Sequence, residues 1–237
     1  MCGRFTLDIP SERLVKAFGL TEHPTIHPRY NIAPTQQVPI IRQYADGQNR
    51  LDYLHWGLIP AWAKSRAIGS RLINARSETV TEKPAFRQAV QCRRCLVLVS
   101  GYYEWRQERK GRQPLYVHLK HDNLMVLAGL WDSWKSSEGE VVDSCTILTT
   151  TSNRLTESRR SSWMFIEARE HRMPVILHLD GHQVWLDRDI TDPARLERLY
   201  YPYPADLMGS WSVSPLINNI KNDSANLICP VGDPFIH

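Results

Sequence analysis

The sequence has 237 residues, of which 42% are hydrophobic and 23% charged, and its net charge is +4 at pH 7. A chain of this length buries one sizeable core, so we expect one domain over residues 1–237. The small net charge is compatible with nucleic-acid binding but does not identify a binder, and it fits a local basic groove better than a strong general DNA binder. The longest apolar stretch, residues 124–131, is too short to cross a bilayer, and residues 1–10 lack the apolar core of a signal peptide. We therefore expect a cytoplasmic protein with reduced thiols and no membrane partner.

In chain order, the first predicted element is a helix with Ser11 as its N-cap and with Leu14, Val15 and Phe18 on one face. The proline-rich residues 23–36 predict a loop. Runs rich in Val, Ile, Leu, Tyr and Trp then predict strands at residues 38–42, 51–56, 95–105, 114–119, 124–131 and 144–150. Helical patterns occur at residues 82–91, 153–170 and 192–200.

Many strands with few helices between them predict an α+β fold with a mainly antiparallel, barrel-like core and a few flanking helices. A parallel sheet would need a helix after nearly every strand. No glycine-rich phosphate loop occurs, so we expect no nucleotide cofactor. Cys92 and Cys95 form a lone C-x-x-C pair without the second pair that a structural zinc site needs, so we expect no metal and place one or both in the core.

Cys2 is the first candidate for chemistry. Removal of Met1 would leave Cys2 with an α-amine beside its thiol, and the reference pKa values of these groups are about 8 and 8.5. A usable fraction of the amine is then an uncharged nucleophile at neutral pH. Such an aminothiol condenses with an aldehyde, because the amine forms a Schiff base and the thiol closes a thiazolidine ring. Position alone favours the alternative, an incidental cysteine after the initiator methionine.

Six motifs that occur in one order along the chain favour a functional role for Cys2 instead. They are MCGRF, RYNIAPTQ, WGLIPAWAK, LINARSET, SGYYEW and RMPVIL. Together they resemble the SOS response-associated peptidase family, whose members cross-link to abasic DNA, and the matches extend from Met1 to the C-terminal NNIKNDSANLI. The resemblance implies a compact α+β domain around a barrel of strands. It also implies self-removal of Met1, a groove for single-stranded DNA, and Cys2 as the cross-linking residue.

Glu104 and Asn74 are the next candidates. Glu104 ends an apolar run, and a carboxyl group in apolar surroundings suits a general acid or base, although a surface residue at a strand end is the alternative. The resemblance implies a catalytic Glu104 that transfers protons in Met1 release and ring closure. Asn74 and Arg76 alternate along a predicted strand, so they share one face. We expect Asn74 to orient the aldehyde or the Cys2 backbone and Arg76 to hold a phosphate, the alternative being an ordinary polar strand face.

Four further residues are predicted DNA contacts. Arg4 and Arg172 resemble positions that contact the DNA backbone. Trp62 and Pro34 lie in loops where flanking bases can stack, which is worth about 1–3 kcal/mol per base on an aromatic side chain. Trp is more often a core residue, so Trp56 has a buried alternative. Pro60 belongs to the same aromatic and proline material, and Lys64, Arg66 and Arg71 would add positive charge nearby.

The histidine of the family motif is displaced in this chain. It normally stands two residues before the Arg of RMP, where this sequence has Glu170, and His171 comes directly before Arg172. We expect His171 to take the role, because an imidazole shuttles protons near neutral pH. The alternatives are that Glu170 fills the role or that the chain lacks it.

Three functions therefore compete. In the leading one, the protein is a monomer that caps abasic sites in single-stranded DNA with little sequence specificity and lies on the nucleoid when bound. In the second it is a cysteine peptidase acting on other proteins, with Cys2, His171 and Glu104. In the third it is a non-catalytic binder of single-stranded or modified DNA, and Met1 stays attached.

Overall fold

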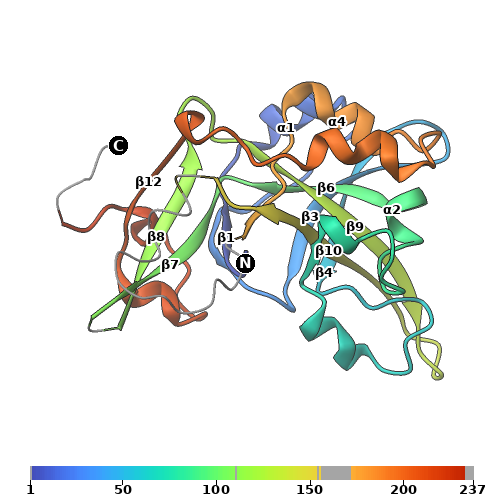
Figure 1. Cartoon of the computed structure of the whole chain (residues 1–237), viewed down its shortest axis with the longest axis horizontal. Coiled ribbons are helices and arrows are strands. Elements are labelled where there is room, and N and C mark those ends of the chain that lie inside the picture. Colours follow the sequence, from blue (N-terminus) through green and yellow to red (C-terminus); the bar gives the residue numbers. More distant parts are fainter. Residues whose placement is uncertain (1, 110, 154, 156–171, 233–237) are drawn as a thin grey trace.

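Five strands close into a barrel in this computed structural model, which describes residues 2–109, 111–153, 155 and 172–232 (Figure 1). The barrel strands are β3 (Gln37–Gln43), β4 (Asn49–Trp56), β6 (Arg94–Val99), β9 (Met125–Lys135) and β10 (Val141–Thr151). β10 pairs with β4 in parallel, and the pairs β4–β3, β3–β6, β6–β9 and β9–β10 are antiparallel. The predicted α+β fold with a mainly antiparallel barrel is confirmed.

The run RCLVLV of β6 is buried at every residue because both of its sides are covered. One side faces the barrel, and helix α4 (Leu179–Leu186) packs on the other, where the Trp185 indole donates to the Cys95 carbonyl at 2.9 Å. Cys95 is buried, as expected, whereas Cys92 is exposed. The continuous apolar run in the sequence thus reflects a strand with no solvent-facing side.

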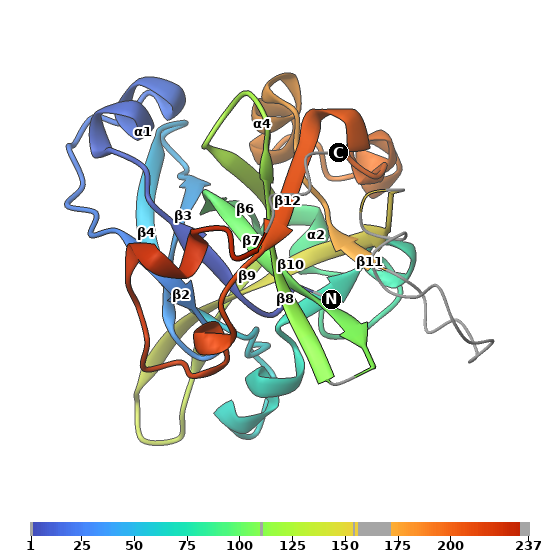
Figure 2. The same ribbon diagram turned by 90° about the vertical axis from the view of Figure 1, so that its left-hand side faces the viewer.

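A second sheet stands beside the barrel, and Figure 2 shows it from the front. Its strands follow the order β12-β8-β7-β1-β2, and all of its pairs are antiparallel. They are β1 (Phe5–Leu7), β2 (Arg29–Ile32), β7 (Gly101–Glu108), β8 (Gly111–Leu119) and β12 (Met208–Ser212). Two short strands, β5 (Asn74–Arg76) and β11 (Arg172–Pro174), pair with β10 at the edge of the barrel.

The chain passes from the barrel to the second sheet at Ser100. The sequence predicted one strand over residues 95–105, but the structure divides it into β6 and β7, which belong to different sheets. Ser100 accepts a hydrogen bond from the Asp8 N–H at 2.6 Å. Gly101 follows, and a Cβ atom there would lie 2.6 Å from the Tyr116 ring, so the close approach requires glycine.

The helices differ from the sequence patterns in their start, length or type. Helix α1 (Ser11–Phe18) has Pro10 at its N-cap position without a side-chain cap, so Ser11 is its first residue. Helix α2 (Ala89–Cys92) is preceded by turns, because Pro84 interrupts the pattern predicted over residues 82–91. Pro193–Tyr200 is a 3-10 helix, and the helix predicted over residues 153–170 lies largely outside the described residues.

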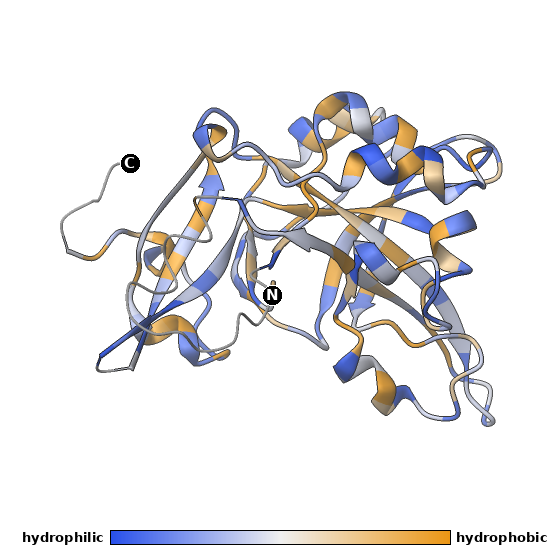
Figure 3. Ribbon diagram, viewed as in Figure 1, coloured by the Kyte–Doolittle hydropathy of each residue, from blue (hydrophilic) through white to orange (hydrophobic). Residues whose placement is uncertain are grey.

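The predicted loop over residues 23–36 contains the strand β2, because its backbone pairs with β1 at Phe5 and Ile32. Helices α1 and α4 lie on the same side of the molecule (Figure 1). Figure 3 shows that both carry hydrophobic and hydrophilic residues, as helices with one buried face do. None of the described helices is long and apolar enough to cross a membrane.

Candidate active site

Cys2 lies where the two sheets meet. It is fully buried and stands three residues before Phe5, the first residue of β1. β1 is hydrogen-bonded to both β2 and β7 in the second sheet. The Phe5 ring also packs against Trp56 at the end of the barrel strand β4, with 4.8 Å between ring centroids. These contacts hold the start of the chain between the barrel and the second sheet.

Asn74 holds the backbone of Cys2. Its Nδ2 atom donates to the Cys2 carbonyl at 2.8 Å. The strand β5 delivers this side chain because it runs parallel to β10, with Asn74 paired to Ile147. The Asn74 Oδ1 atom is buried and has no hydrogen-bond partner among the described residues. One end of this amide thus fixes Cys2, and the other end offers a buried acceptor at the same place.

Glu104 approaches Cys2 from the second sheet. The Tyr103 N–H donates to the Arg4 carbonyl at 2.9 Å, which aligns β7 with the segment that carries Cys2. Glu104 is only 7% exposed. Burial raises the pKa of the Cys2 thiol to about 12, and the negative charge of Glu104 adds to the rise. The thiol is therefore protonated at neutral pH and needs a proton acceptor before it can act as a nucleophile.

Arg4 and Arg76 lie at different depths. Arg4 is half-buried, and its Nη1 atom donates to Asn31 Oδ1 at 2.5 Å and to the Ile217 carbonyl at 2.8 Å. Burial lowers the pKa of Arg4. Arg76 is exposed at the end of β5, two residues after Asn74. Of these two predicted phosphate contacts, Arg76 is the one that faces solvent beside the Asn74 strand.

Arg172 is almost completely enclosed, with 3% of its side chain exposed. Its guanidinium donates to Thr149 Oγ1 at 3.0 Å, to the Thr149 carbonyl at 2.6 Å and to Glu78 at 2.7 Å. Despite the opposing effect of burial, the hydrogen bond from Arg172 lowers the pKa of Glu78. Arg172 thus joins β10 and β11 to the turn that follows β5, and β5 is the strand that carries Asn74.

The two predicted stacking residues belong to separate loops. Trp62 is 60% exposed, whereas Trp56 is fully buried and its Nε1 atom donates to the Ile73 carbonyl at 2.9 Å. Pro34 is half-buried in the turn between β2 and β3, next to Thr35, which has a φ of 72°. The Thr35 N–H donates to the Trp56 carbonyl at 2.8 Å. The other loop positions are the buried Pro60 and the exposed Lys64, Arg66 and Arg71.

Two predictions fall on residues that the structure does not describe. Both His171 and the alternative Glu170 lie outside the described residues, as does Met1. The structure brings together Cys2, Asn74 and Glu104 from three distant parts of the sequence, and it places Arg76 beside them.

Three polar residues that support the site were not singled out from the sequence. Glu78 and Thr149 bind Arg172, as described above. Asp132 is 6% exposed and anchors the loop that carries Trp62. An acidic residue inside the apolar run LMVLAGLWDSW was a usable signal, because a carboxylate in such a strand is buried only with hydrogen-bonding partners.

The fold and the site define a class of proteins whose site is centred on a buried cysteine. Asn74 at the barrel edge holds Cys2, and Glu104 of the second sheet faces it. The family SOS response associated peptidase (SRAP) matches this chain over residues 1–220, and the chain belongs to this family.

Named relatives cover the chain almost completely. It is 41% identical over 233 residues to the abasic site processing protein YoqW of Bacillus subtilis, covering 96% of this chain and 99% of that protein. It is 28% identical over 282 residues to the abasic site processing protein HMCES of Mus musculus, covering 97% and 76%. A crystal structure of a protein from Bacteroides thetaiotaomicron superposes with a TM-score of 0.83 at 25% identity, covering 97% of this chain and all of that one.

Proposed function

We propose that this protein processes abasic sites in single-stranded DNA and bonds to them covalently through Cys2. Relatives named abasic site processing proteins support the substrate class. The observation that carries the chemistry is the hydrogen bond from Asn74 to the Cys2 carbonyl beside the charge of Glu104. This arrangement fixes the backbone of the residue that becomes the N-terminus when Met1 is removed.

The reaction has three balanced steps. Hydrolysis of the peptide bond after Met1 consumes one water and exposes the α-amine of Cys2. This amine adds to the C1′ aldehyde of the opened abasic sugar, and loss of one water gives a Schiff base. The Cys2 thiol then adds across the C=N bond, its proton passes to the nitrogen, and the thiazolidine ring closes without a further leaving group.

Glu104 moves the protons in this scheme. The Cys2 thiol is protonated at neutral pH, so a base must accept its proton before sulfur attacks carbon. The carboxylate of Glu104, next to Cys2, takes that proton and returns it to the ring nitrogen. His171 serves as a second proton shuttle in this proposal, one residue after the position where the family motif carries its histidine and this chain has Glu170.

The DNA lies on the surface beside this site. Arg76 holds a phosphate next to the lesion, and Arg4 and Pro34 border the path of the strand from the second sheet. Arg172 acts from inside the protein, because its hydrogen bonds to Thr149 and Glu78 hold the turn after β5 in place. Trp62 offers an exposed indole to a flanking base.

Intact mass tests the proposal. The purified protein is weighed alone and after incubation with single-stranded DNA that carries one abasic site. We expect loss of one methionine residue, followed by a gain of one DNA strand less one water. The Cys2→Ala variant should gain no mass. A denaturant-resistant adduct in that variant would refute the role of Cys2, whereas retained Met1 without any adduct would favour a non-catalytic DNA-binding protein.

A second measurement tests whether the protein cleaves other proteins. A nucleophile that stands directly behind Met1 is better explained by one self-cleavage than by repeated cleavage of other proteins. Purified protein should therefore leave unrelated peptides intact under conditions where it releases Met1. Sustained release of products from added peptides would favour the peptidase function instead.

A further inference from the structure

The loop over residues 57–72 leaves the barrel after β4 and returns just before β5. Its two ends are joined by a hydrogen bond from the Leu58 N–H to the Leu72 carbonyl at 3.1 Å. Gly57 and Gly69 touch between these ends, because a Cβ atom on Gly57 would lie 2.6 Å from the Gly69 carbonyl oxygen. The loop therefore starts after Trp56, which packs against Phe5, ends two residues before Asn74, and carries Trp62 on its outer part.

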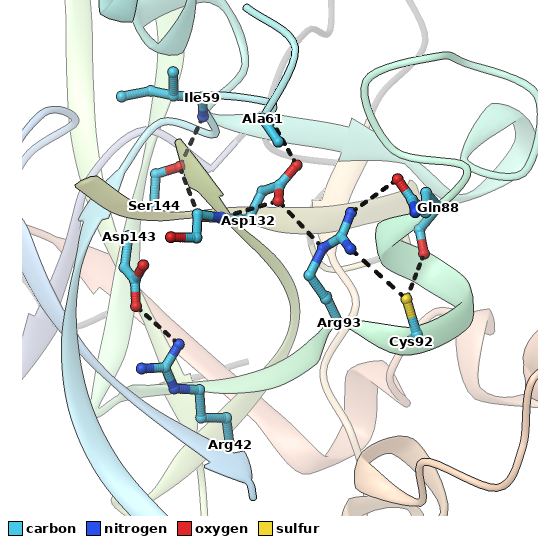
Figure 4. Close-up of polar contacts among 10 residues, drawn as sticks. Arg42, Ile59, Ala61, Gln88, Cys92, Arg93, Asp132, Asp143 and Ser144 are labelled. Atoms are coloured by element: carbon cyan, nitrogen blue, oxygen red, sulfur yellow. Dashed lines mark hydrogen bonds and ion pairs between the residues drawn. The ribbon is translucent and has the colours of Figure 1, made fainter. Parts of the chain in front are cut away.

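Asp132 of β9 anchors this outer part (Figure 4). Its Oδ2 atom accepts from the N–H of Ala61, the residue next to Trp62, at 3.0 Å. Its Oδ1 atom accepts from the Ser133 N–H at 2.9 Å and lies 3.3 Å from Arg93 Nε. A buried carboxylate with three such partners is held in one orientation, so the backbone on one side of Trp62 is fixed.

Two further contacts fix the rest of the loop. The Ile59 N–H donates to Ser144 Oγ at 2.8 Å, and the Trp134 indole donates to the Ala63 carbonyl at 2.6 Å. Ile59, Ala63 and Trp134 also form a small buried cluster of their own beneath the loop. Trp62 is thus exposed on a backbone that is held at Ile59, Ala61 and Ala63. An aromatic side chain so presented needs little ordering when it binds a ligand.

Trp62 borders a pocket between this loop and the residues that lead into α2. Arg87, Gln88, Arg93 and Asp132 line the same pocket. Arg87 is exposed and forms no ion pair with the residues that the structure describes, whereas the charge of Arg93 is already matched by Asp132. The pocket therefore offers an indole face, one available cation and the amide of Gln88, which together suit one nucleotide with its base on Trp62 and its phosphate at Arg87.

We infer that Asp132 is a positioning residue for DNA binding and that this pocket takes one nucleotide of the bound strand. The inference rests on the proposed function. Asp132 acts through the Ala61 N–H, which sets the direction of Trp62, and through Arg93, which it neutralises and keeps beside Gln88. Loss of its negative charge weakens the hydrogen bond from the Ala61 N–H and loosens the Trp62 backbone, so the cost of ordering Trp62 falls on DNA binding.

Binding of an undamaged single-stranded oligonucleotide tests the inference, because such DNA has no aldehyde and the covalent step is absent. Fluorescence anisotropy is recorded for the wild type and for D132N, W62A and the double variant. We expect each single variant to bind about tenfold more weakly, the effect of losing one stacked base. The double variant should bind about as weakly as W62A alone, because both changes remove the same contact.

The matched control is D143N. Asp143 accepts from Arg42 at 3.0 Å in the neighbouring part of the same view and does not line the pocket (Figure 4). The D143N variant should bind DNA with the same affinity as the wild type. Unchanged binding by D132N, or losses in D132N and W62A that multiply in the double variant, would overturn the positioning role.

A melting temperature is measured for every variant. If D132N does not fold, W62A and R87Q test the pocket instead, because both replace exposed side chains. Unchanged DNA affinity in both variants would then refute the proposed nucleotide pocket. Adduct formation on abasic DNA is scored separately. Adducts from the wild type together with unaltered binding by W62A and R87Q would refute the pocket alone, whereas the absence of any wild-type adduct would refute the proposed function.

Discussion

Asn74 donates a hydrogen bond to the carbonyl of Cys2 across 2.8 Å, although 72 positions separate the two residues in the chain. The bond ties the first residues of the protein to the edge of the barrel. It also leaves the Asn74 Oδ1 atom buried without a hydrogen-bond partner among the described residues, where an amine or a sugar hydroxyl could supply a donor.

Replacement of Asn74 by Asp should slow adduct formation about tenfold. The carboxylate keeps the shape of the side chain but cannot donate to the Cys2 carbonyl, and one hydrogen bond is worth about 0.5–1.5 kcal/mol. Single-turnover adduct formation on a denaturing gel measures the effect. Asn49→Asp is the matched control, because Asn49 also donates to a carbonyl, that of Phe18 at 3.1 Å, and has a buried Oδ1 atom. Equal rates for both variants would contradict a special role of Asn74.

Replacement of Glu104 by Gln should have two opposite effects on Cys2. Removal of the negative charge lowers the pKa of the Cys2 thiol, so more thiolate is present at a given pH. Adduct formation should nevertheless slow by about 10²–10⁴-fold, the usual contribution of a general acid or base. The ultraviolet absorbance of thiolate, taken as a difference from Cys2→Ala, follows the first effect. Glu108→Gln, on the exposed end of the same strand, should change neither quantity.

Arg172 and Arg76 should respond differently to replacement by Gln. Arg172→Gln should lower the free energy of unfolding by about 1–3 kcal/mol, because buried acceptors of Thr149 lose their donor. Arg76→Gln should leave stability unchanged and reduce the salt dependence of DNA binding by about 0.7 in the slope of log K against log salt, the effect of one phosphate contact to a single strand. Denaturant unfolding and binding titrations at several salt concentrations separate the two. A reduced salt slope in Arg172→Gln would instead indicate a direct phosphate contact.

The unfolding free energy should fall at alkaline pH because of buried thiols. Burial raises the pKa of Cys145 from 9.0 to about 12, so its contribution is complete below pH 9 and is lost as the pH rises towards 12. Between these values the unfolded chain releases a proton that the folded chain retains, which costs up to about 1.4 kcal/mol per pH unit. Cys145→Ala should flatten the pH dependence by one proton. Cys229→Ala, at an exposed thiol, should leave it unchanged, and equal slopes in the two variants would contradict the assignment.

Local patterns in the sequence determined where the barrel strands lie and which residues are candidates for chemistry. Runs of β-branched and aromatic residues located the barrel strands, because strand formation depends on neighbouring residues that fit a pleated, buried surface. The motifs also singled out Cys2, Asn74 and Glu104 as candidates for chemistry, and the structure brings these three together. Their identities could be read from the chain because each stands inside a short motif.

The tertiary structure alone decided which candidates face solvent. Trp56 and Trp62 occur six positions apart in one motif, yet the first is fully buried against Phe5 and the second is 60% exposed. Arg172 was a predicted DNA contact, but its guanidinium is occupied by Thr149 and Glu78. Such outcomes depend on contacts between segments far apart in the chain, and the burial of a side chain is set by what the rest of the fold packs against it.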